Sequence, residues 1–143
     1  MTGLTLLFVT CFLSATVLPF SSELVFAGAL LKSDHPAWIL VLIASLGNTL
    51  GGLTGYALGR AGKTSWLVRY FGFSEARFLR WQIYIRRYGH WLAFFGFAPI
   101  IGDFLGIALG FFRASFWRVA VLMTLGKTLR YILLAWLLYG QRF

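Results

Sequence analysis

Long apolar runs without a charged side chain divide this chain into segments. The run from Ala37 to Gly59 has 23 residues, and about 20 apolar residues are enough to span a bilayer as a helix. The run from Phe116 to Tyr139 is also long enough, although Lys127 and Arg130 lie near its middle. These runs predict two transmembrane helices. Residues 1–22 are uncharged and lack the basic start of a secretory signal, so we expect a retained membrane segment there.

Two further apolar runs are too short to cross a membrane. Leu24 to Leu31 ends before Lys32, and Phe104 to Phe112 ends before Arg113. Each run follows an acid that stands four residues after a proline: Pro19 before Glu23, and Pro99 before Asp103. Non-helical backbone is tolerated at membrane depth only inside protein or along a wet cavity. We therefore expect two re-entrant helical hairpins whose tips face the interior.

The same features recur in both halves of the chain. Residues 18–23 resemble residues 98–103 at an offset of 80, and residues 47–50 resemble residues 126–129 at an offset of 79. We predict an all-α integral membrane protein, a single membrane domain built from two copies of a re-entrant hairpin plus a transmembrane helix. Broken segments at matching places in two halves are typical of transporters, and a chance likeness between short apolar segments is the alternative. Repeat 1 covers about residues 4–59, a linker about 60–90 and repeat 2 about 91–140.

The linker is strongly basic. Between Arg60 and Arg87 it holds seven Lys and Arg residues and the single acid Glu75. From Ser74, which we expect to be an N-cap, apolar and basic positions follow helical spacing on neighbouring faces, which predicts a basic amphipathic helix on the membrane surface. A linker that only fixes the orientation of the protein is the alternative. The expected surface contacts are Arg77, Arg80, Arg86 and Arg87.

Composition narrows the class of protein. Hydrophobic residues make up 59% of the chain and charged residues 12%, which is about half the charged share of soluble domains. This excludes a soluble enzyme, a disordered chain and a free nucleic-acid-binding domain. The net charge of +9 is therefore expected to set the topology and to contact anionic lipids, not nucleic acid.

The positions of the basic residues predict the orientation. With one re-entrant hairpin and one spanning helix in each half, nine of the 13 Lys and Arg residues lie on the side of the linker. Basic residues accumulate on the cytoplasmic side of a membrane protein. Both termini are then outside, and the two halves are inverted copies. The alternative is that the first segments cross the membrane completely instead of re-entering, and this would change the predicted locations of the termini.

Four ionisable residues fall inside apolar sequence: the acids Glu23 and Asp103 and the bases Lys127 and Arg130. A central charge costs about 2.5–3.5 kcal/mol to insert, so we expect these residues to pair or to line a cavity. In a transport site the acids would bind and release protons, and the bases would hold a phosphate head group or act as counter-charges. A structural salt-bridge cluster that holds the two halves together is the alternative.

Glycines recur at every fourth position and are expected to let helices pack closely in lipid. Little supports other chemistry. Cys11 is the single cysteine and is expected to pack in the interior, and the two histidines are far apart and lack a nearby pair of carboxylates. We expect no metal, no cofactor and no enzymatic activity. The packing glycines are Gly47, Gly51, Gly55 and Gly59 in the first half and Gly102, Gly106 and Gly110 in the second.

Six stretches carry a family resemblance: residues 18–23, 35–36, 47–54, 59–60, 99–103 and 126–131. Together they resemble the DedA superfamily, also called the SNARE-associated or VTT-domain family, and most of all its small YqaA-like branch. The resemblance implies a multi-pass protein of the bacterial inner membrane with two opposed re-entrant hairpins. The re-entrant acid of the family corresponds to Glu23. The family's arginines near the second hairpin have no counterpart from Gly96 to Gly102, where Asp103 follows instead.

The resemblance also implies a function. Members of the family are implicated in moving lipids between leaflets, and some are linked to a polyprenyl-phosphate carrier and to proton-motive force. We therefore expect a lipid translocator of the scramblase or flippase type, whose partners are an anionic or polyprenyl-phosphate lipid and protons. A homodimer would suit a protein with so few helices. The alternatives are a non-transporting membrane scaffold that supports envelope integrity and a transporter of small ions or solutes.

Overall fold

The structure is a computed structural model that describes residues 2–16, 22–62, 74–98 and 101–140. Within these ranges every regular element is a helix, as the apolar pattern predicts. The breaks predicted at Pro19 and Pro99 lie outside the described residues. The elements are α1 (Thr2–Thr16), α2 (Ser22–Lys32), α3 (Ala37–Ala61), α5 (Glu75–Tyr88), the 3₁₀ helix η1 (Gly89–Phe97), α6 (Ile101–Phe111) and α7 (Phe116–Tyr139).

Two of these helices are long and apolar enough to cross a membrane: α3 with 25 residues and α7 with 24. α3 begins at Ala37, as predicted, and continues two residues past Gly59. α7 covers the predicted run from Phe116 to Tyr139, and its two central cations do not interrupt the helix. α1 and α6 are apolar but shorter, and their length is insufficient for a full crossing.

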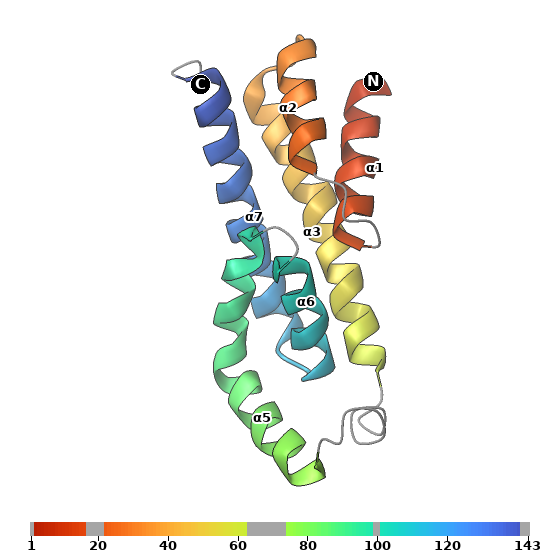
Figure 1. Cartoon of the computed structure of the whole chain (residues 1–143), viewed down its shortest axis with the longest axis vertical. Coiled ribbons are helices and arrows are strands. Elements are labelled where there is room, and N and C mark those ends of the chain that lie inside the picture. The colour runs from red at the N-terminus through yellow and green to blue at the C-terminus, as the bar shows by residue number, and fades with distance from the viewer. Residues whose placement is uncertain (1, 17–21, 63–73, 99–100, 141–143) are drawn as a thin grey trace.

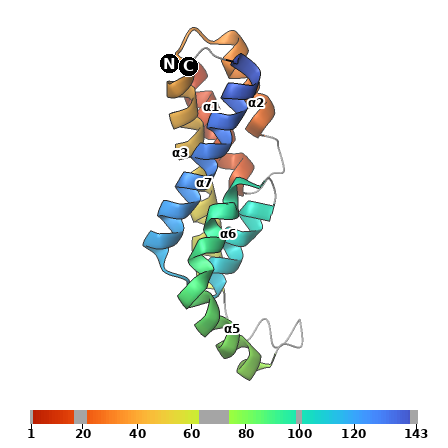
Figure 2. The ribbon, with the colours of Figure 1, turned by 90° about the vertical axis from the view of Figure 1, so that its left-hand side faces the viewer.

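Figures 1 and 2 show an elongated molecule in which α3 and α7 run in opposite directions. α1 and α2 are antiparallel to each other and pack against the first part of α3, in the upper half of the figures. η1 and α6 are likewise antiparallel and pack between the second part of α3 and the first part of α7, in the lower half. The start of α1 and the end of α7 lie at the same, upper end.

Buried apolar side chains form two separate cores. The upper core joins α1, α2, the start of α3 and the end of α7, and it includes Cys11, Phe26 and Tyr131. The lower core joins the end of α3, η1, α6 and the start of α7 around Tyr56 and Met123. Each long helix therefore contributes to both cores, and the middle residues of α3 and α7 lie between them. Cys11 is buried, as the sequence predicts.

Glycines allow helix backbones to touch. A Cβ atom added to Gly59 on α3 would lie within 3.0 Å of the backbone oxygen of Ile107 on α6, closer than real Cβ atoms approach. The same holds for Gly126 on α7 and the backbone oxygen of Phe94 on η1. Any side chain there would push two backbones apart. Of the predicted packing glycines, Gly47 and Gly51 face α1, Gly55, Gly59, Gly106 and Gly110 lie between α3 and α6, and Gly102 is buried at the start of α6.

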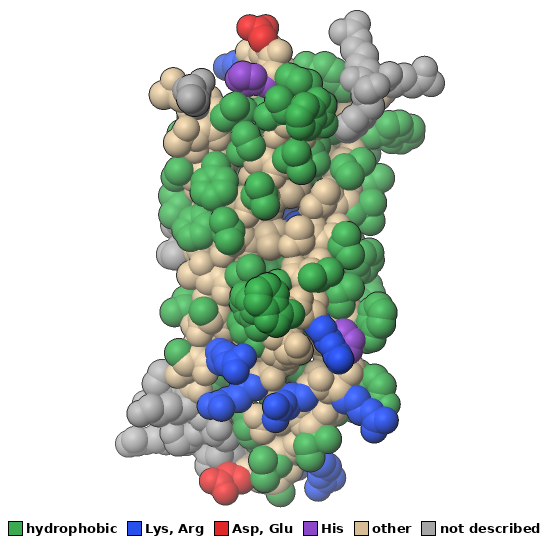
Figure 3. Space-filling model, turned by 180° about the vertical axis from the view of Figure 1, so that it is seen from behind, with side chains coloured by type: hydrophobic (Ala, Val, Ile, Leu, Met, Phe, Trp, Pro, Cys, Tyr) green, Lys and Arg blue, Asp and Glu red, His purple; other side chains and the backbone are tan. Residues whose placement is uncertain are grey.

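The lower end of the molecule is basic. α5 begins after Ser74, whose hydroxyl accepts a hydrogen bond from the backbone N–H of Arg77 at 3.3 Å, as expected for an N-cap. Phe78 is buried against the rings of Phe111 and Phe112, which anchors α5 beside the end of α6. Figure 3 shows most of the visible Lys and Arg side chains gathered at this end, below a largely apolar surface. The predicted surface arginines of α5 are all exposed: Arg77, Arg80, Arg86 and Arg87.

Candidate functional site: a polar layer between two apolar cores

Polar side chains gather where α3 and α7 pass between the two cores. Glu23 lies in the first turn of α2, and Asp103 lies in the first turn of α6, where the helix dipole favours a negative charge. Lys127 and Arg130 are three residues apart on α7, so their side chains leave the helix on one side. We call this group the polar layer, and it consists of Ser22, Glu23, Asn48, Asp103, Lys127 and Arg130.

The Lys127 ammonium is enclosed. The side chain is 1% exposed, and its Nζ lies 3.1 Å from Oδ1 of Asp103. It also donates hydrogen bonds to the backbone oxygen of Asn48 at 2.9 Å and to Asn48 Oδ1 at 2.5 Å. An ammonium has three N–H donors, so these three acceptors use all of them. Asp103 is the open side of this pair, because its side chain is 32% exposed.

Arg130 is less enclosed. Its Nη2 lies 2.9 Å from Oε1 of Glu23 and 3.3 Å from Oγ of Ser22, and its Nη1 donates to the backbone oxygen of Phe97 at 3.4 Å. The side chain of Arg130 is 13% exposed and that of Glu23 is 38% exposed. Among the described residues, the buried Nε of Arg130 has no hydrogen-bond partner. The guanidinium therefore has donors that its ion pair does not use.

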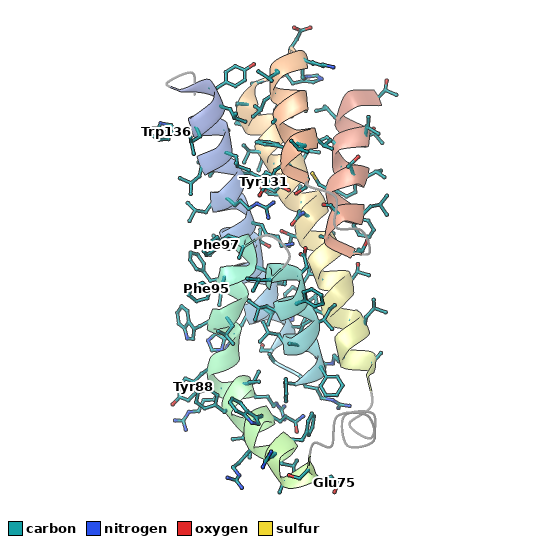
Figure 4. The ribbon with its side chains drawn as sticks, in the orientation of Figure 1. Glu75, Tyr88, Phe95, Phe97, Tyr131 and Trp136 are labelled. Atoms are coloured by element: carbon teal, nitrogen blue, oxygen red, sulfur yellow. The ribbon has the colours of Figure 1, made fainter. Side chains whose placement is uncertain are left out.

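Hydrogen bonds around the two pairs attach them to the upper helices. Asn48 donates from Nδ2 to the backbone oxygen of Cys11 at 3.2 Å, which connects α3 to α1. The hydroxyl of Tyr131 donates to Oγ of Ser22 at 2.9 Å, which connects α7 to the start of α2. Figure 4 shows Tyr131 pointing from α7 toward the interior at the level where α2 begins, whereas Trp136 points outward from α7. The polar layer thus connects five α-helices, α1, α2, α3, α6 and α7, and also contacts η1.

The structure brings the four ionisable residues of the apolar runs together as two ion pairs, and each pair joins α7 to the start of one short helix. The arginines of α5 lie far from them, at the lower end. The sequence pattern does not predict Asn48, Ser22 and Tyr131 as the polar partners that they are in the structure. The repeat could have indicated Asn48, because residues 47–50 match residues 126–129 and Asn48 stands at the position of Lys127.

This arrangement can perform two kinds of chemistry. Carboxylates that are about a third exposed can exchange protons with water, and a guanidinium with unused donors can bind an oxyanion such as phosphate. Within the described part of the chain, no group of three or more His, Cys, Asp or Glu side chains is placed to hold a metal ion. The expectation that the protein needs no metal or cofactor stays a prediction.

Comparison with known proteins adds the family. Residues 18–140 match the family model of the VTT domain. The chain is 38% identical over 133 residues to the inner membrane protein YqaA of Escherichia coli K12, a match that covers 90% of this chain and 86% of that protein. A protein of Haemophilus influenzae is 37% identical over 145 residues, which cover 94% of this chain and 87% of that protein. No solved structure matches the chain.

Proposed function

The chain belongs to the VTT-domain (DedA) family and is a protein of the bacterial inner membrane, and from this premise we propose that it moves lipids between the two leaflets. The cargo is an anionic lipid, with polyprenyl phosphate as the first candidate, and protons are the candidate coupling ion. The polar layer carries this proposal, because it places two ion pairs between the apolar cores of a protein with a largely apolar surface. Ionisable residues inside a membrane protein usually mark a transport path.

We infer that the fold is an inverted repeat, with α1–α2 and η1–α6 as two re-entrant hairpins. Matching positions 79 residues apart support this inference. Gly47 on α3 faces the backbone oxygen of Phe8 on α1, and Gly126 on α7 faces that of Phe94 on η1. Asn48 and Lys127 also match, and they contact each other, as equivalent residues do beside a two-fold axis.

The basic lower end supports an orientation. Lys and Arg side chains favour the cytoplasmic side, so the lower end with α5 faces the cytoplasm and both termini face the periplasm. Compartment-sensitive reporters fused to the start and to the end of the chain test this directly. Two periplasmic signals support the re-entrant hairpins, and two cytoplasmic signals contradict them.

We assign each ion pair a part in the cycle. Glu23 and Asp103 are the proton-responsive groups, and Arg130 and Lys127 supply the contact to the head group or the counter-charge. Both carboxylates are partly exposed, so water can deliver a proton. Protonation of a carboxylate would weaken its ion pair and leave the cation of α7 free to attract a phosphate group.

Leaflet exchange in liposomes tests the proposal. The purified protein is reconstituted, and the exchange of labelled lipids, including a polyprenyl phosphate, is followed with and without a pH gradient. The Glu23→Gln/Asp103→Asn variant is expected to insert and fold but to lose exchange. The matched control is Asp34→Asn/Glu75→Gln, which removes the other two acids of the chain and should retain exchange. Normal exchange by the first variant removes the proton-site role, and no exchange by the folded wild type contradicts lipid translocation.

The exposed arginines of α5 favour a second candidate, a membrane scaffold that docks a partner at the cytoplasmic end. Under that function, replacing Arg77, Arg80 and Arg87 with Gln would harm cells more than replacing Glu23 or Asp103. Complementation of a strain with an envelope defect compares the two sets of variants. A transporter of small ions or solutes would use the same polar layer, and it is distinguished by ion flux in the same liposomes without lipid exchange.

A further inference from the structure

The two cations of α7 differ in how many of their donors are occupied. Lys127 uses all three N–H donors within the protein and is 1% exposed. Two of its three acceptors belong to Asn48, which is itself fixed to the backbone of α1. Lys127 could bind a ligand only by breaking contacts to α3 and α6 together, and each buried acceptor left without a donor costs free energy.

Arg130, in contrast, has N–H donors that no acceptor among the described residues occupies. It has five N–H donors, and its Nε has no partner among the described residues, while the bond from Nη1 to Phe97 is long at 3.4 Å. Its counter-ion Glu23 is the more exposed of the two acids at 38%. If the Glu23 carboxylate turned away from Arg130, water could hydrate it, whereas the guanidinium would stay largely enclosed and would need another anion.

We propose that Arg130 exchanges the Glu23 carboxylate for a phosphate group, and that Lys127, held by Asn48, takes no part in this exchange. The inference rests on the proposed function for its choice of an anionic head group. A guanidinium binds phosphate through two parallel hydrogen bonds, and the unused Nε provides one of these donors. Ser22 provides a further donor, because its Oγ accepts the bonds from Arg130 and Tyr131 and its own proton is left to donate.

Replacing one anion with another keeps the enclosed guanidinium neutralised at each stage. This explains why Glu23 lies beside Arg130: the carboxylate is a competitor that occupies the anion site until the phosphate arrives. It follows that Glu23→Gln strengthens phosphate binding, although it is expected to abolish lipid exchange. Binding and exchange therefore respond in opposite directions to one substitution.

Two variants of matched charge test the assignment. Glu23→Gln/Arg130→Gln and Asp103→Asn/Lys127→Gln each remove one acid and one base from the polar layer. The full-length protein in phosphatidylcholine nanodiscs is titrated with inorganic phosphate by calorimetry. In nanodiscs prepared with equal amounts of phosphatidic acid and phosphatidylcholine, native mass spectrometry then counts the bound molecules of each lipid, so that binding of a lipid head group is distinguished from binding of free phosphate.

We expect the Arg130 variant to bind phosphate about tenfold or more weakly than the wild type, and the Lys127 variant to bind within about threefold of it. Arg130→Lys keeps the charge and the Glu23 pair but loses the planar pair of donors, so it should also bind more weakly, which provides a test if the double variant fails to fold. Equal weakening in both double variants, or wild-type protein that binds neither probe, overturns the inference. Lipid exchange without Arg130-dependent phosphate binding leaves the proposed function standing and removes this inference. Arg130-dependent phosphate binding without lipid exchange supports this inference and contradicts the proposed function.

Discussion

α3 and α7 have nearly the same length and cross the same two cores, yet they hold their neighbours by different means. α3 packs its glycines against backbone atoms of α1 and α6, and a larger share of it is buried. α7 has one such contact at Gly126, and it adds polar contacts in the interior through Lys127, Arg130 and Tyr131. α3 therefore holds its neighbours by close backbone packing, whereas α7 provides the cations of the polar layer.

The position where the two helices meet explains why only α7 carries charged residues in its middle. Asn48 and Lys127 contact each other directly, so a lysine at both positions would bring two ammonium groups together inside the protein. Like charges in such an environment repel strongly. A neutral amide at position 48 instead offers an oxygen to Lys127, and this leaves both cations on one helix, within reach of both acids.

Removing the enclosed cation gives the largest expected effect. Lys127→Met removes the partner of the partly exposed Asp103 and also leaves Oδ1 of the buried Asn48 without its donor, so it should cost about 3 kcal/mol. Arg130→Met should cost less, because the more exposed Glu23 can be hydrated. Unfolding in mixed micelles, followed by circular dichroism, measures both free energies. Asp103→Asn/Lys127→Met should recover part of the loss, and a larger loss for Arg130→Met would reverse the proposed difference between the two cations.

Adding a Cβ atom at these glycines tests whether both α3 and α7 depend on close contact between helix backbones. Gly59→Ala on α3 and Gly126→Ala on α7 each place a Cβ against a backbone oxygen, so each should lower the free energy of unfolding by about 1–3 kcal/mol. The matched control is Gly28→Ala on α2, where an added Cβ meets no atom within 4 Å. The same micelle unfolding assay applies. A neutral Gly126→Ala would mean that backbone contact matters for α3 alone.

The Asn48–Lys127 contact predicts an energetic coupling between α3 and α7. Asn48→Leu removes the side-chain acceptor of Lys127, and once Lys127 is methionine the same change should cost less. A double-mutant cycle over Asn48→Leu and Lys127→Met is expected to give a coupling of about 1 kcal/mol or more. Additive losses would show that the two helices are stabilised independently of each other.

The lipid-facing sides of the two helices should show the smallest effect. Trp38 in the first turn of α3 and Trp117 in the first turn of α7 are both exposed, and they lie at opposite ends of the molecule. Trp38→Leu and Trp117→Leu should each change the free energy of unfolding by no more than about 0.5 kcal/mol. Quenching by lipids brominated at known depths should place both tryptophans near an interface. A large loss at one site alone would show that this side is an interface with protein instead of lipid.

The structure can be predicted from the sequence where the signal is local. The limits of α7 and the Ser74 cap follow from hydrophobic runs and helix-start residues, and the structure has both. The prediction is less complete in the polar layer. Ser22 is neutral and stands among apolar residues, so neither composition nor spacing marks it, and Asn48 is marked only by its match with Lys127 in the repeat. The importance of both residues arises from what folding places beside them.

Hydrophobicity and charge act along the chain, residue by residue. They therefore suffice to predict a helical membrane protein with two helices long enough to span, a basic end and four ionisable residues in apolar surroundings. Which acid pairs with which base depends on helix packing. Lys127 and Arg130 leave α7 on the same side, and the packing of α2 and α6 around α3 alone sets which of them is enclosed by Asn48 and Asp103 and which remains beside the exposed Glu23.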